Sequence, residues 1–364
     1  MLRKSVTLSL QEKISFINKS GKQAFSLSNP SFNPKNLKNI NLKYFNLQGN
    51  LSGDQRLKDI AKIHLFEDWQ NIDKLKHDIL ITNGAKAALY CVFKGLINQN
   101  QKNICVINPN WPTYVDLIKL CNAKPFFYNT HLKDNFNINL QRLKKFIINH
   151  KIRILILTNP NNPTGKIIKN NTINELIKIC TALKCYLVID ESFSLYFFNE
   201  KELFIKKELS SKYLIIINSF SKNFHLQGLR LGAILSVKNL LAIFTNIHIA
   251  INGAPSSIAQ NIVIDHKKNA LKLHKSGTLS NLKIVTNFLK SKNVQFYKPD
   301  GSFYLFPKIK NLKNFLNNSE KRGLFYLSGS AFGNKYKDHY RLCFEKKTNE
   351  LNSILKIMDK YELY

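Results

Sequence analysis

Short apolar runs alternate with helical patterns through the middle of the chain. Between residues 75 and about 240 the runs are rich in β-branched residues and apolar throughout. Such runs, separated by helices, predict a mostly parallel sheet that helices cover on both faces. The predicted strands are residues 78–82, 104–107, 125–128, 154–157, 186–189 and 214–217. The predicted helices begin near Lys86, Thr113, Leu140, Thr172 and Lys238.

The pattern changes after Asn261. A long, basic helical stretch reaches about Lys292, and a turn at 299–301 and a strand at 303–306 follow it. This order predicts a second, smaller α+β domain with the long helix as the joint. The predicted division is therefore an N-terminal segment that packs on the small domain, a large domain and a small C-terminal domain. Their limits are 1–45, 46–262 and 263–364.

Polar residues follow the predicted strands directly. They lie at 83–86, 108–111, 159–160, Asp190 and 219–222. In parallel sheets, ligands bind beyond the carboxyl ends of the strands. The shared location therefore predicts one binding site at this edge of the sheet.

The composition indicates a large globular protein and raises the question of a nucleic-acid partner. The 364 residues, 44% of them hydrophobic, can bury a sizeable core. The formal net charge of +32 would ordinarily indicate a nucleic-acid partner. The lysines, however, are spread evenly among asparagines and isoleucines, and no DNA- or RNA-binding motif accompanies them. We expect no specific nucleic-acid binding and only weak adhesion to polyanions.

The cysteines and the N-terminus indicate the compartment. The six cysteines, mostly inside apolar runs, show no C-x-x-C or metal-ligand spacing and are Cys91, Cys105, Cys121, Cys180, Cys185 and Cys343. They are typical of reduced core residues in a cytosolic protein without a metal site. The N-terminus has no apolar signal-peptide core, and no stretch is long enough to cross a bilayer. We expect a cytoplasmic protein that does not contact membranes.

The segment 219–232 places a lysine, two hydroxyls and an arginine around a Gly-rich turn. A lysine among apolar neighbours and near other cations can lose its proton and form a Schiff base, as Lys222 could. Hydroxyls and a guanidinium at Ser219, Ser221 and Arg230 can hold a phosphate dianion. The segment therefore indicates an aldehyde cofactor that carries a phosphate. An ordinary lysine beside a β-turn is the alternative.

Two further positions fit such a cofactor. Asp190 ends an apolar run, where it could cap a helix or pair with a protonated pyridine nitrogen. A buried ion pair is costly unless both partners are present, so an acid at this position gains its partner when the cofactor binds. Gly84 opens a helix after a predicted strand, and free backbone N–H groups at such a helix start can hold a phosphate.

The chain resembles, from about Ser26 to Phe344, pyridoxal-phosphate enzymes of the aspartate aminotransferase superfamily, aminotransferase class I and II. The motifs that carry the resemblance are the turn N-P-x-N-P-T-G at 159–165, the order of Asp190, Lys222 and Arg230, and the segment 329–344. The resemblance implies fold type I of the pyridoxal-phosphate transferases. The cofactor-binding residues that it implies are Gly84, Ala85, Lys86, Trp111, Asn159, Asp190, Ser219, Ser221, Lys222 and Arg230.

The resemblance also implies distinct roles for single residues of the cofactor and substrate sites. Trp111 stacks on the ring, and Asn159, the first asparagine of the turn, meets the O3′ oxygen. Arg341 grips the substrate α-carboxylate, because a guanidinium forms a two-pronged pair that lysine cannot copy. Asn159 and Ser28 share the substrate site. On residue type alone, Trp111 could equally be a core residue and Arg341 a surface residue of a strand.

The chain departs from the family at three places. Phe193 stands where the family carries a tyrosine, and it cannot donate to O3′, so the pKa of the Schiff base should rise. Ser28 replaces a glycine that usually approaches the substrate. Residues 47–53 lack the tyrosine that a neighbouring subunit commonly sends to the phosphate. These departures bear on substrate type and rate more than on cofactor binding.

We therefore predict a cytoplasmic pyridoxal-phosphate aminotransferase that moves an amino group between an L-amino acid and a 2-oxo acid by a ping-pong mechanism. Lys222 and Asp190 are the predicted catalytic residues, with Lys222 as general base and acid. The resemblance also implies a homodimer. An amino-acid decarboxylase or carbon–sulfur β-lyase of the same fold stays open, because fold does not fix reaction. So does a non-catalytic aminotransferase-like regulator, although we find no added DNA-binding module. The substrate side chain is not predicted.

Overall fold

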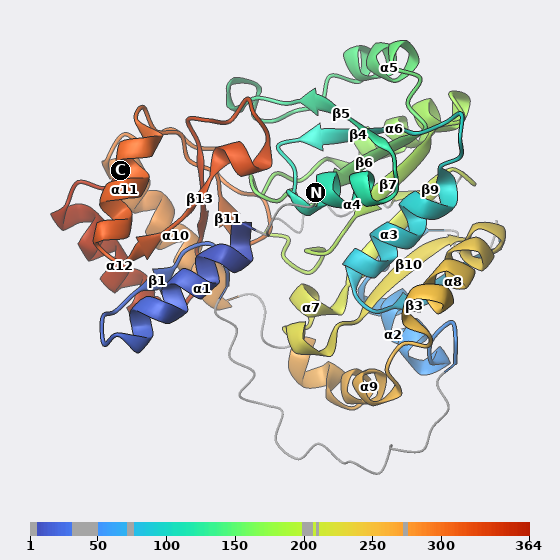
Figure 1. Cartoon of the computed structure of the whole chain (residues 1–364), viewed down its shortest axis with the longest axis horizontal. Helices are drawn as coiled ribbons and strands as arrows, with labels where there is room; N and C mark the ends of the chain where they lie inside the picture. Colours follow the sequence, from blue (N-terminus) through green and yellow to red (C-terminus); the bar gives the residue numbers. More distant parts are fainter. Residues whose placement is uncertain (1–5, 31–49, 71–75, 199–206, 209–210, 272–275) are drawn as a thin grey trace.

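A seven-stranded sheet forms the centre of the larger part of the molecule (Figure 1). The computed structural model describes residues 6–30, 50–70, 76–198, 207–208, 211–271 and 276–364. The strand order is β3–β10–β9–β7–β6–β4–β5, and only β10 runs antiparallel to its neighbours. The strands are β3 His77–Thr82, β4 Asn103–Asn108, β5 Lys124–Asn129, β6 Ile154–Thr158, β7 Tyr186–Asp190, β9 Leu214–Ser219 and β10 Gly232–Val237. The mostly parallel α/β fold that the sequence predicts is confirmed.

Alternate residues of each central strand enter different cores. In β6, Leu155 and Leu157 pack with one set of helices, while Ile154 and Ile156 pack with the other. Because side chains alternate across a strand and helices cover both faces, the whole run must be apolar. One face is covered by α2 Gln55–His64, α5 Leu140–Asn149, α6 Asn170–Ala182 and α9 Ser257–Leu271. The other is covered by α3 Ala85–Leu96, α4 Thr113–Leu120 and α8 Lys238–Asn252.

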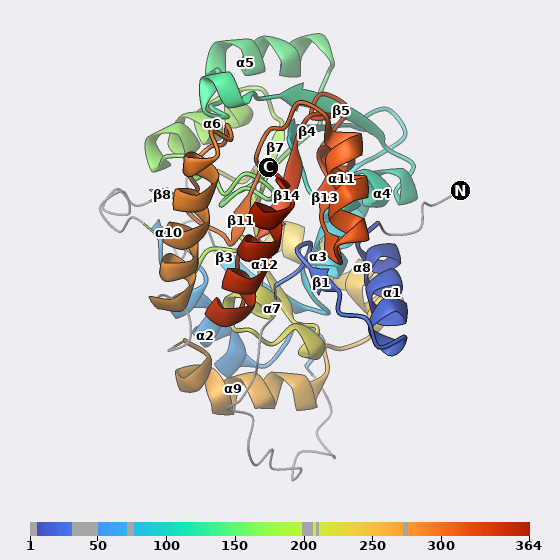
Figure 2. The ribbon, with the colours of Figure 1, turned by 90° about the vertical axis from the view of Figure 1, so that its left-hand side faces the viewer.

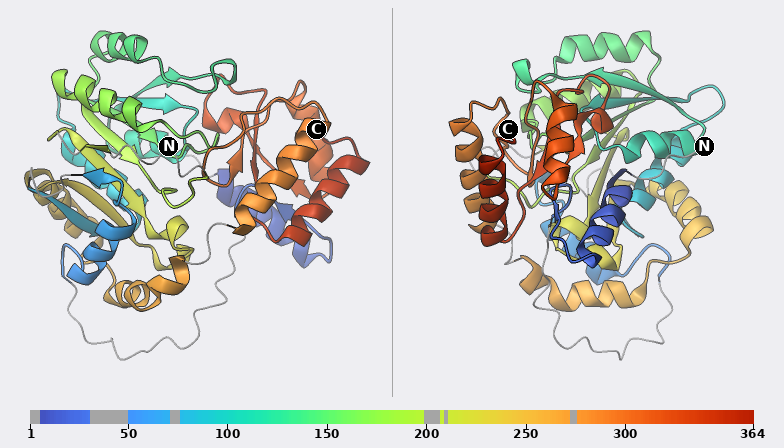
Figure 3. Two further views of the ribbon diagram at one scale, coloured as in Figure 1. Left: turned by 180° about the vertical axis from the view of Figure 1, so that it is seen from behind. Right: turned by 60° about the vertical axis from the view of Figure 1, so that its left-hand side comes forward.

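A second core lies in the part of the molecule formed by residues 6–30 and 276–364, which we call the small part (Figures 2 and 3). Its sheet has the order β11–β14–β13, and a short parallel pair joins β1 to β12. The strands are β1 Phe25–Ser26, β11 Tyr304–Leu305, β12 Leu324–Phe325, β13 Leu327–Ser328 and β14 Tyr340–Cys343. The helices are α1 Val6–Lys19, α10 Ser276–Ser291, α11 Leu312–Lys321 and α12 Thr348–Lys360.

The long basic stretch expected after Asn261 is described as two helices. α9 contributes Ala259 and Val263 to the core beneath the large sheet, whereas α10 packs with α12 in the small part. Residues 272–275 between them lie outside the described residues. The boundary at 262/263 falls inside α9, and the boundary at 45/46 lies outside the described residues. The division into three segments therefore stays a proposal.

Two smaller observations bear on the sequence predictions. All six cysteines are buried and unpaired by disulfides, as expected of core residues. Among the helices of the described residues, none combines the length and the apolar character that crossing a membrane requires.

A short parallel pair, β2 Trp69–Gln70 with β8 Lys207–Glu208, lies beside the large sheet and contributes to the polar network described below.

Candidate active site

The sheet register aligns the predicted site residues along one edge. Ser219 at the end of β9 pairs with Gly232, which in turn pairs with Thr82 at the end of β3. Asp190 at the end of β7 pairs with Thr158 of β6 and with Ile217 of β9. Because neighbouring strands lie about 4.8 Å apart, the loops that follow these strands meet at one place.

A cradle for an anion forms where α3 and α7 Phe220–Asn223 begin. Ser219 caps α7, with its Oγ accepting from the Ser221 backbone N–H at 3.2 Å. Arg230 Nη1 donates to Ser221 Oγ at 3.2 Å. Gly84 adopts φ 88° at the start of α3, and a Cβ there would lie 2.8 Å from Arg230 Nη2. The two helix starts, two hydroxyls and one guanidinium fit a phosphate dianion.

Lys222 lies in α7, next to this cradle. Its Nζ donates to Gln227 Oε1 at 2.8 Å. Burial, helped by the positive charges of Arg341 and Arg230 and opposed by Cys343, lowers the pKa of the Lys222 amine to about 8. A substantial fraction of the amine is therefore neutral near physiological pH, which a reaction with an aldehyde requires.

Asp190 is buried, with 3% of its surface exposed. Its Oδ2 accepts from the Tyr114 hydroxyl at 2.6 Å, and its Oδ1 accepts from the Ser192 hydroxyl at 2.6 Å and the Ser192 N–H at 3.0 Å. Burial raises the pKa of the carboxyl, and the hydrogen bonds from Ser192 and Tyr114 oppose this. Because a carboxylate accepts about four hydrogen bonds, Asp190 has room for one further donor, such as a protonated ring nitrogen.

Tyr114 and Ser192 are site residues that the sequence reasoning missed. Burial and the nearby Asp190 charge raise the pKa of Tyr114 far above its usual value, so its hydroxyl stays a neutral donor. Ser192 had a usable signal, because a hydroxyl two residues after a buried acid often bonds back to it. Tyr114 had none, because its partner lies 76 residues away in sequence.

Arg341 extends from β14 of the small part towards the turn at 159–165 of the large part. Its Nη1 donates to Asn162 Oδ1 at 2.8 Å, and its Nη2 donates to the Ser28 carbonyl. The guanidinium lies 4.1 Å from the centre of the Tyr304 ring. Its Nε is buried and has no hydrogen-bond partner among the described residues. Arg341 thus lies against the Ser28 carbonyl, and its Nε–H is among the donors that remain for an anion.

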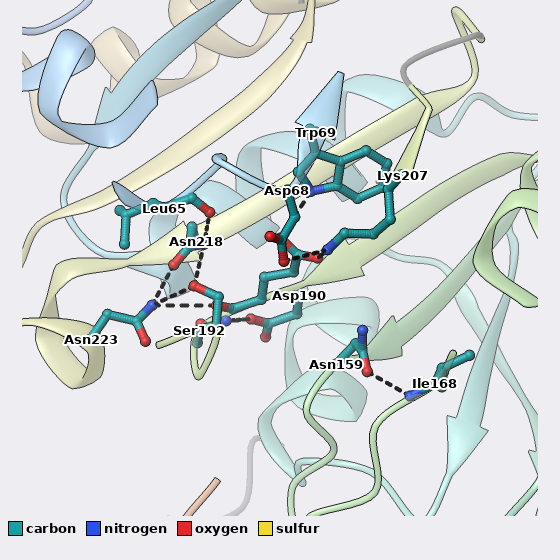
Figure 4. Close-up of polar contacts among 12 residues, drawn as sticks. Leu65, Asp68, Trp69, Asn159, Ile168, Asp190, Ser192, Lys207, Asn218 and Asn223 are labelled. Atoms are coloured by element: carbon teal, nitrogen blue, oxygen red, sulfur yellow. Dashed lines mark hydrogen bonds and ion pairs between the residues drawn. The ribbon is translucent and has the colours of Figure 1, made fainter. Parts of the chain in front are cut away.

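The two asparagines of the turn have different surroundings. Asn159 Oδ1 accepts from the Ile168 N–H at 2.8 Å, and the Asn159 N–H donates to the Asp190 carbonyl at 2.9 Å (Figure 4). Its contact with a cofactor O3′ stays a prediction. Asn162, which the sequence reasoning did not single out, is the turn asparagine that touches Arg341. Its signal was its place in the same motif, three residues later.

The remaining predicted residues lie around these groups. Trp111 meets Tyr114 edge to face, with ring centres 5.6 Å apart. Lys86 Nζ lies 5.4 Å from the centre of the Trp111 ring, and Ala85 begins α3 between Gly84 and Lys86. Phe193 is buried against Phe303, with ring centres 5.3 Å apart. Residues 47–49, part of the segment that lacks the family tyrosine, lie outside the described residues.

A buried ion pair supports the loop after Asp190 (Figure 4). Glu191 pairs with Lys207 and accepts from Trp69 Nε1 at 3.0 Å. The Glu191 and Lys207 side chains are 2% and 1% exposed. Asp68 Oδ2 lies farther from Lys207 Nζ, at 3.9 Å. The charge of Glu191 therefore depends mainly on Lys207 for compensation.

Known proteins are similar to this chain in sequence and in fold. The family described as aminotransferase class I and II matches residues 34–357. An aspartate aminotransferase of Sulfurisphaera tokodaii is 27% identical over 328 residues, which cover 85% of this chain and 80% of the relative. A probable aspartate/prephenate aminotransferase of Rickettsia conorii is 28% identical over 329 residues, covering 84% of this chain and 80% of the relative.

A solved structure shows the same fold. The aspartate aminotransferase from Thermotoga maritima superposes with a TM-score of 0.84 at 22% identity, covering 100% of this chain and 98% of that chain. At this identity the likeness shows the fold alone, and the family match over most of the chain shows the kinship. The chain belongs to the aminotransferase class I and II family and is a pyridoxal-phosphate-dependent aminotransferase.

Proposed function

We propose that Lys222 and Asp190 hold opposite ends of one pyridoxal phosphate, and that the enzyme uses it to pass an amino group from an L-amino acid to a 2-oxo acid in two half-reactions. The observation that carries this proposal is the lowered pKa of Lys222, about 8, beside a cradle suited to phosphate. When bound, the cofactor supplies an aldehyde that exchanges amines and a ring that accepts electrons from the α-carbon.

The residues around the ring nitrogen keep its proton in place. Asp190 accepts that proton's hydrogen bond, and Tyr114 and Ser192 hold the carboxylate by donating to its two oxygens. Because Asp190 is buried, its charge is best compensated when the ring N–H is present. Gly84, Ala85 and Lys86 with Ser219, Ser221 and Arg230 bind the phosphate. Trp111 covers one face of the ring.

The substrate side of the site orients the α-carbon. Arg341 binds the α-carboxylate, with Asn162 and the Ser28 carbonyl fixing the guanidinium. Lys222 Nζ would accept the α-proton as general base and return a proton as general acid. Holding the carboxylate in this way turns the C–H bond that breaks towards Lys222, so orientation supplies much of the rate.

The identity of the amino donor, the assembly and the compartment are also proposals. Several relatives bear the name aspartate aminotransferase, so we propose aspartate as the first amino donor to test. We also propose a cytoplasmic homodimer, in keeping with the family resemblance and with the buried, reduced cysteines.

Amine transfer can be tested directly. Purified protein is loaded with pyridoxal phosphate and given aspartate with a panel of 2-oxo acids, and new amino acids are identified by mass spectrometry. Transfer that requires an oxo acid is expected, and it should be lost in Lys222→Ala but kept in Lys178→Ala, whose side chain is 71% exposed. Release of carbon dioxide or ammonia without an amino acceptor would instead indicate a decarboxylase or a lyase.

A further inference from the structure

Two asparagines flank the α7 turn that carries Lys222 (Figure 4). Asn218 lies in β9 and Asn223 ends α7, and neither exposes any of its surface. Neither amide is required by the cofactor contacts described above. A buried amide costs free energy unless its hydrogen bonds are made. The hydrogen bonds of these two side chains therefore show what holds the two amides in the interior.

Asn223 ties the Lys222 turn to the loop that follows Asp190. Its Oδ1 accepts from the Leu195 N–H at 3.0 Å. Its Nδ2 lies 3.2 Å from Ser194 Oγ and 3.4 Å from the Glu191 carbonyl, both as acceptors. One side chain thus bonds to three residues of the loop that follows Asp190.

Asn218 completes the network on the other side. Its Oδ1 accepts from Asn223 Nδ2 at 2.6 Å and from the Ser219 N–H at 2.7 Å. Its Nδ2 donates to the Leu65 carbonyl at 2.9 Å and to Ser194 Oγ at 3.0 Å. Both amides are fully used, and a satisfied buried network of this kind is rigid. The network spans three segments: the end of α2, the Asp190 loop and α7.

This geometry matters because Lys222 and Asp190 must act on one ring. We infer that Asn223, through Asn218 and Ser194, is a positioning residue that fixes Lys222 relative to Asp190. The inference rests on the proposed function, since it assumes that both residues serve the same cofactor. It adds residues that touch neither cofactor nor substrate. A displacement of about 1 Å in such a group can lower a rate about a hundredfold.

The test compares variants of the network with a matched asparagine elsewhere. Asn223→Ala removes the tie, and Ser194→Ala is a milder change that removes one shared acceptor. Asn103→Ala is the control. Asn103 also bridges two segments, with Nδ2 donating to the His150 carbonyl at 2.7 Å, but it begins β4 at the opposite end of the sheet.

Two readouts separate positioning from general stability. In the cofactor-free protein, hydrogen exchange of the Leu195 amide should speed up in Asn223→Ala and not in Asn103→Ala. In the loaded enzyme, kcat should fall about tenfold to a hundredfold, with KM changed less than about threefold because Arg341 is untouched. Ser194→Ala should show a smaller decrease of the same kind. Asn218→Ala added to Asn223→Ala should lower kcat by no more than about a further twofold, because the two side chains belong to one hydrogen-bond network.

The opposite results are equally clear. A kcat that stays within about twofold of wild type in Asn223→Ala would overturn the inference, whatever happens to the unfolding temperature. If Asn223→Ala fails to fold, an unchanged kcat in Ser194→Ala overturns it in the same way. A comparable loss in Asn103→Ala would also overturn it. Failure of the proposed function is recognised separately, because the wild-type protein would then bind no pyridoxal phosphate and transfer no amine.

Discussion

Replacement of Lys207 by methionine should destabilise the protein strongly and in a pH-dependent way. Methionine keeps most of the apolar stem of the side chain, one atom shorter than lysine, but removes the charge that compensates Glu191. The Glu191 carboxylate is 2% exposed, so water cannot take the place of the ammonium group. Trp69 still donates to Glu191 Oε2, and among the described residues this neutral donor is the side-chain compensation that remains.

The size of the effect follows from these contacts. Breaking a buried pair by removing one partner costs about 3–5 kcal/mol, because an uncompensated charge stays inside. Asp68 changes this little, since it lies 3.9 Å from Lys207 Nζ and is 28% exposed. The matched control is Lys178→Met, which breaks an exposed pair with Glu175 and should cost no more than about 0.5 kcal/mol.

The pH dependence has a definite sign. Burial raises the pKa of Glu191 above its usual value of 4.5, although Lys207 and Trp69 oppose the shift. A raised carboxyl pKa means that the folded protein binds this proton more tightly than the unfolded chain, so the contribution of Glu191 to stability falls as the pH rises above 4.5. Without Lys207 the pKa rises further. The loss in Lys207→Met should therefore be larger at pH 8 than at pH 5.

The loss of unfolding free energy in Lys207→Met is measured by urea unfolding of the cofactor-free protein at both pH values, with circular dichroism as the signal. Adding Glu191→Gln to Lys207→Met removes the charge and keeps an acceptor for Trp69, so the double variant should be more stable than Lys207→Met at pH 8. A loss below about 1 kcal/mol at pH 8, or one that is equal at both pH values, would refute the reasoning.

Three further predictions concern the site. The rate at which cofactor-free protein captures pyridoxal phosphate, measured by stopped-flow absorbance, should rise with pH around a midpoint near the Lys222 pKa of about 8. A midpoint near the usual lysine pKa of 10.5 would contradict this. Arg341→Lys should raise KM for amino acids about tenfold or more, because the two-pronged pair is lost, while cofactor absorbance persists; an unchanged KM contradicts the assigned role. Phe193→Tyr should lower the pH midpoint of the visible absorption change, since it restores a hydroxyl beside O3′, and a pH titration showing no shift would argue against this.

The central strands could be predicted because strands that are buried on both faces have continuous apolar sequences. Residues 154–157 are apolar at every position since each face of β6 meets a helix layer. β10 was not predicted. Its sequence, 232–237, contains glycine, alanine and serine and directly follows the motif around Arg230, so neither length nor apolar character marked it. It lies antiparallel between β9 and β3, and β3 is distant in sequence.

The long helix was predicted as one element for a different reason. Helical periodicity continues from α9 into α10, and the residues between them, 272–275, include no glycine or proline. What separates the two helices is the core that each joins, α9 beneath the large sheet and α10 in the small part. Tertiary packing of this kind is not written in local periodicity.

The candidate site divides in the same way. Asp190, Ser219 and Lys222 could be found because they directly follow strands, where a parallel sheet gathers its loops. Asn223 and Asn218 could not be recognised, because their inferred role depends on hydrogen bonds to each other and to the loop that follows Asp190. Whether a buried polar side chain is satisfied is decided only once the segments meet.

The central claim is that Lys222, out of many lysines, holds the cofactor. Reduction of the pyridoxal-phosphate-loaded protein with borohydride, followed by digestion and peptide mass spectrometry, locates the attachment. The expected result is one cofactor per chain, on the peptide that contains Lys222. Attachment at another lysine, or none in a protein that nevertheless binds the cofactor, would contradict the account.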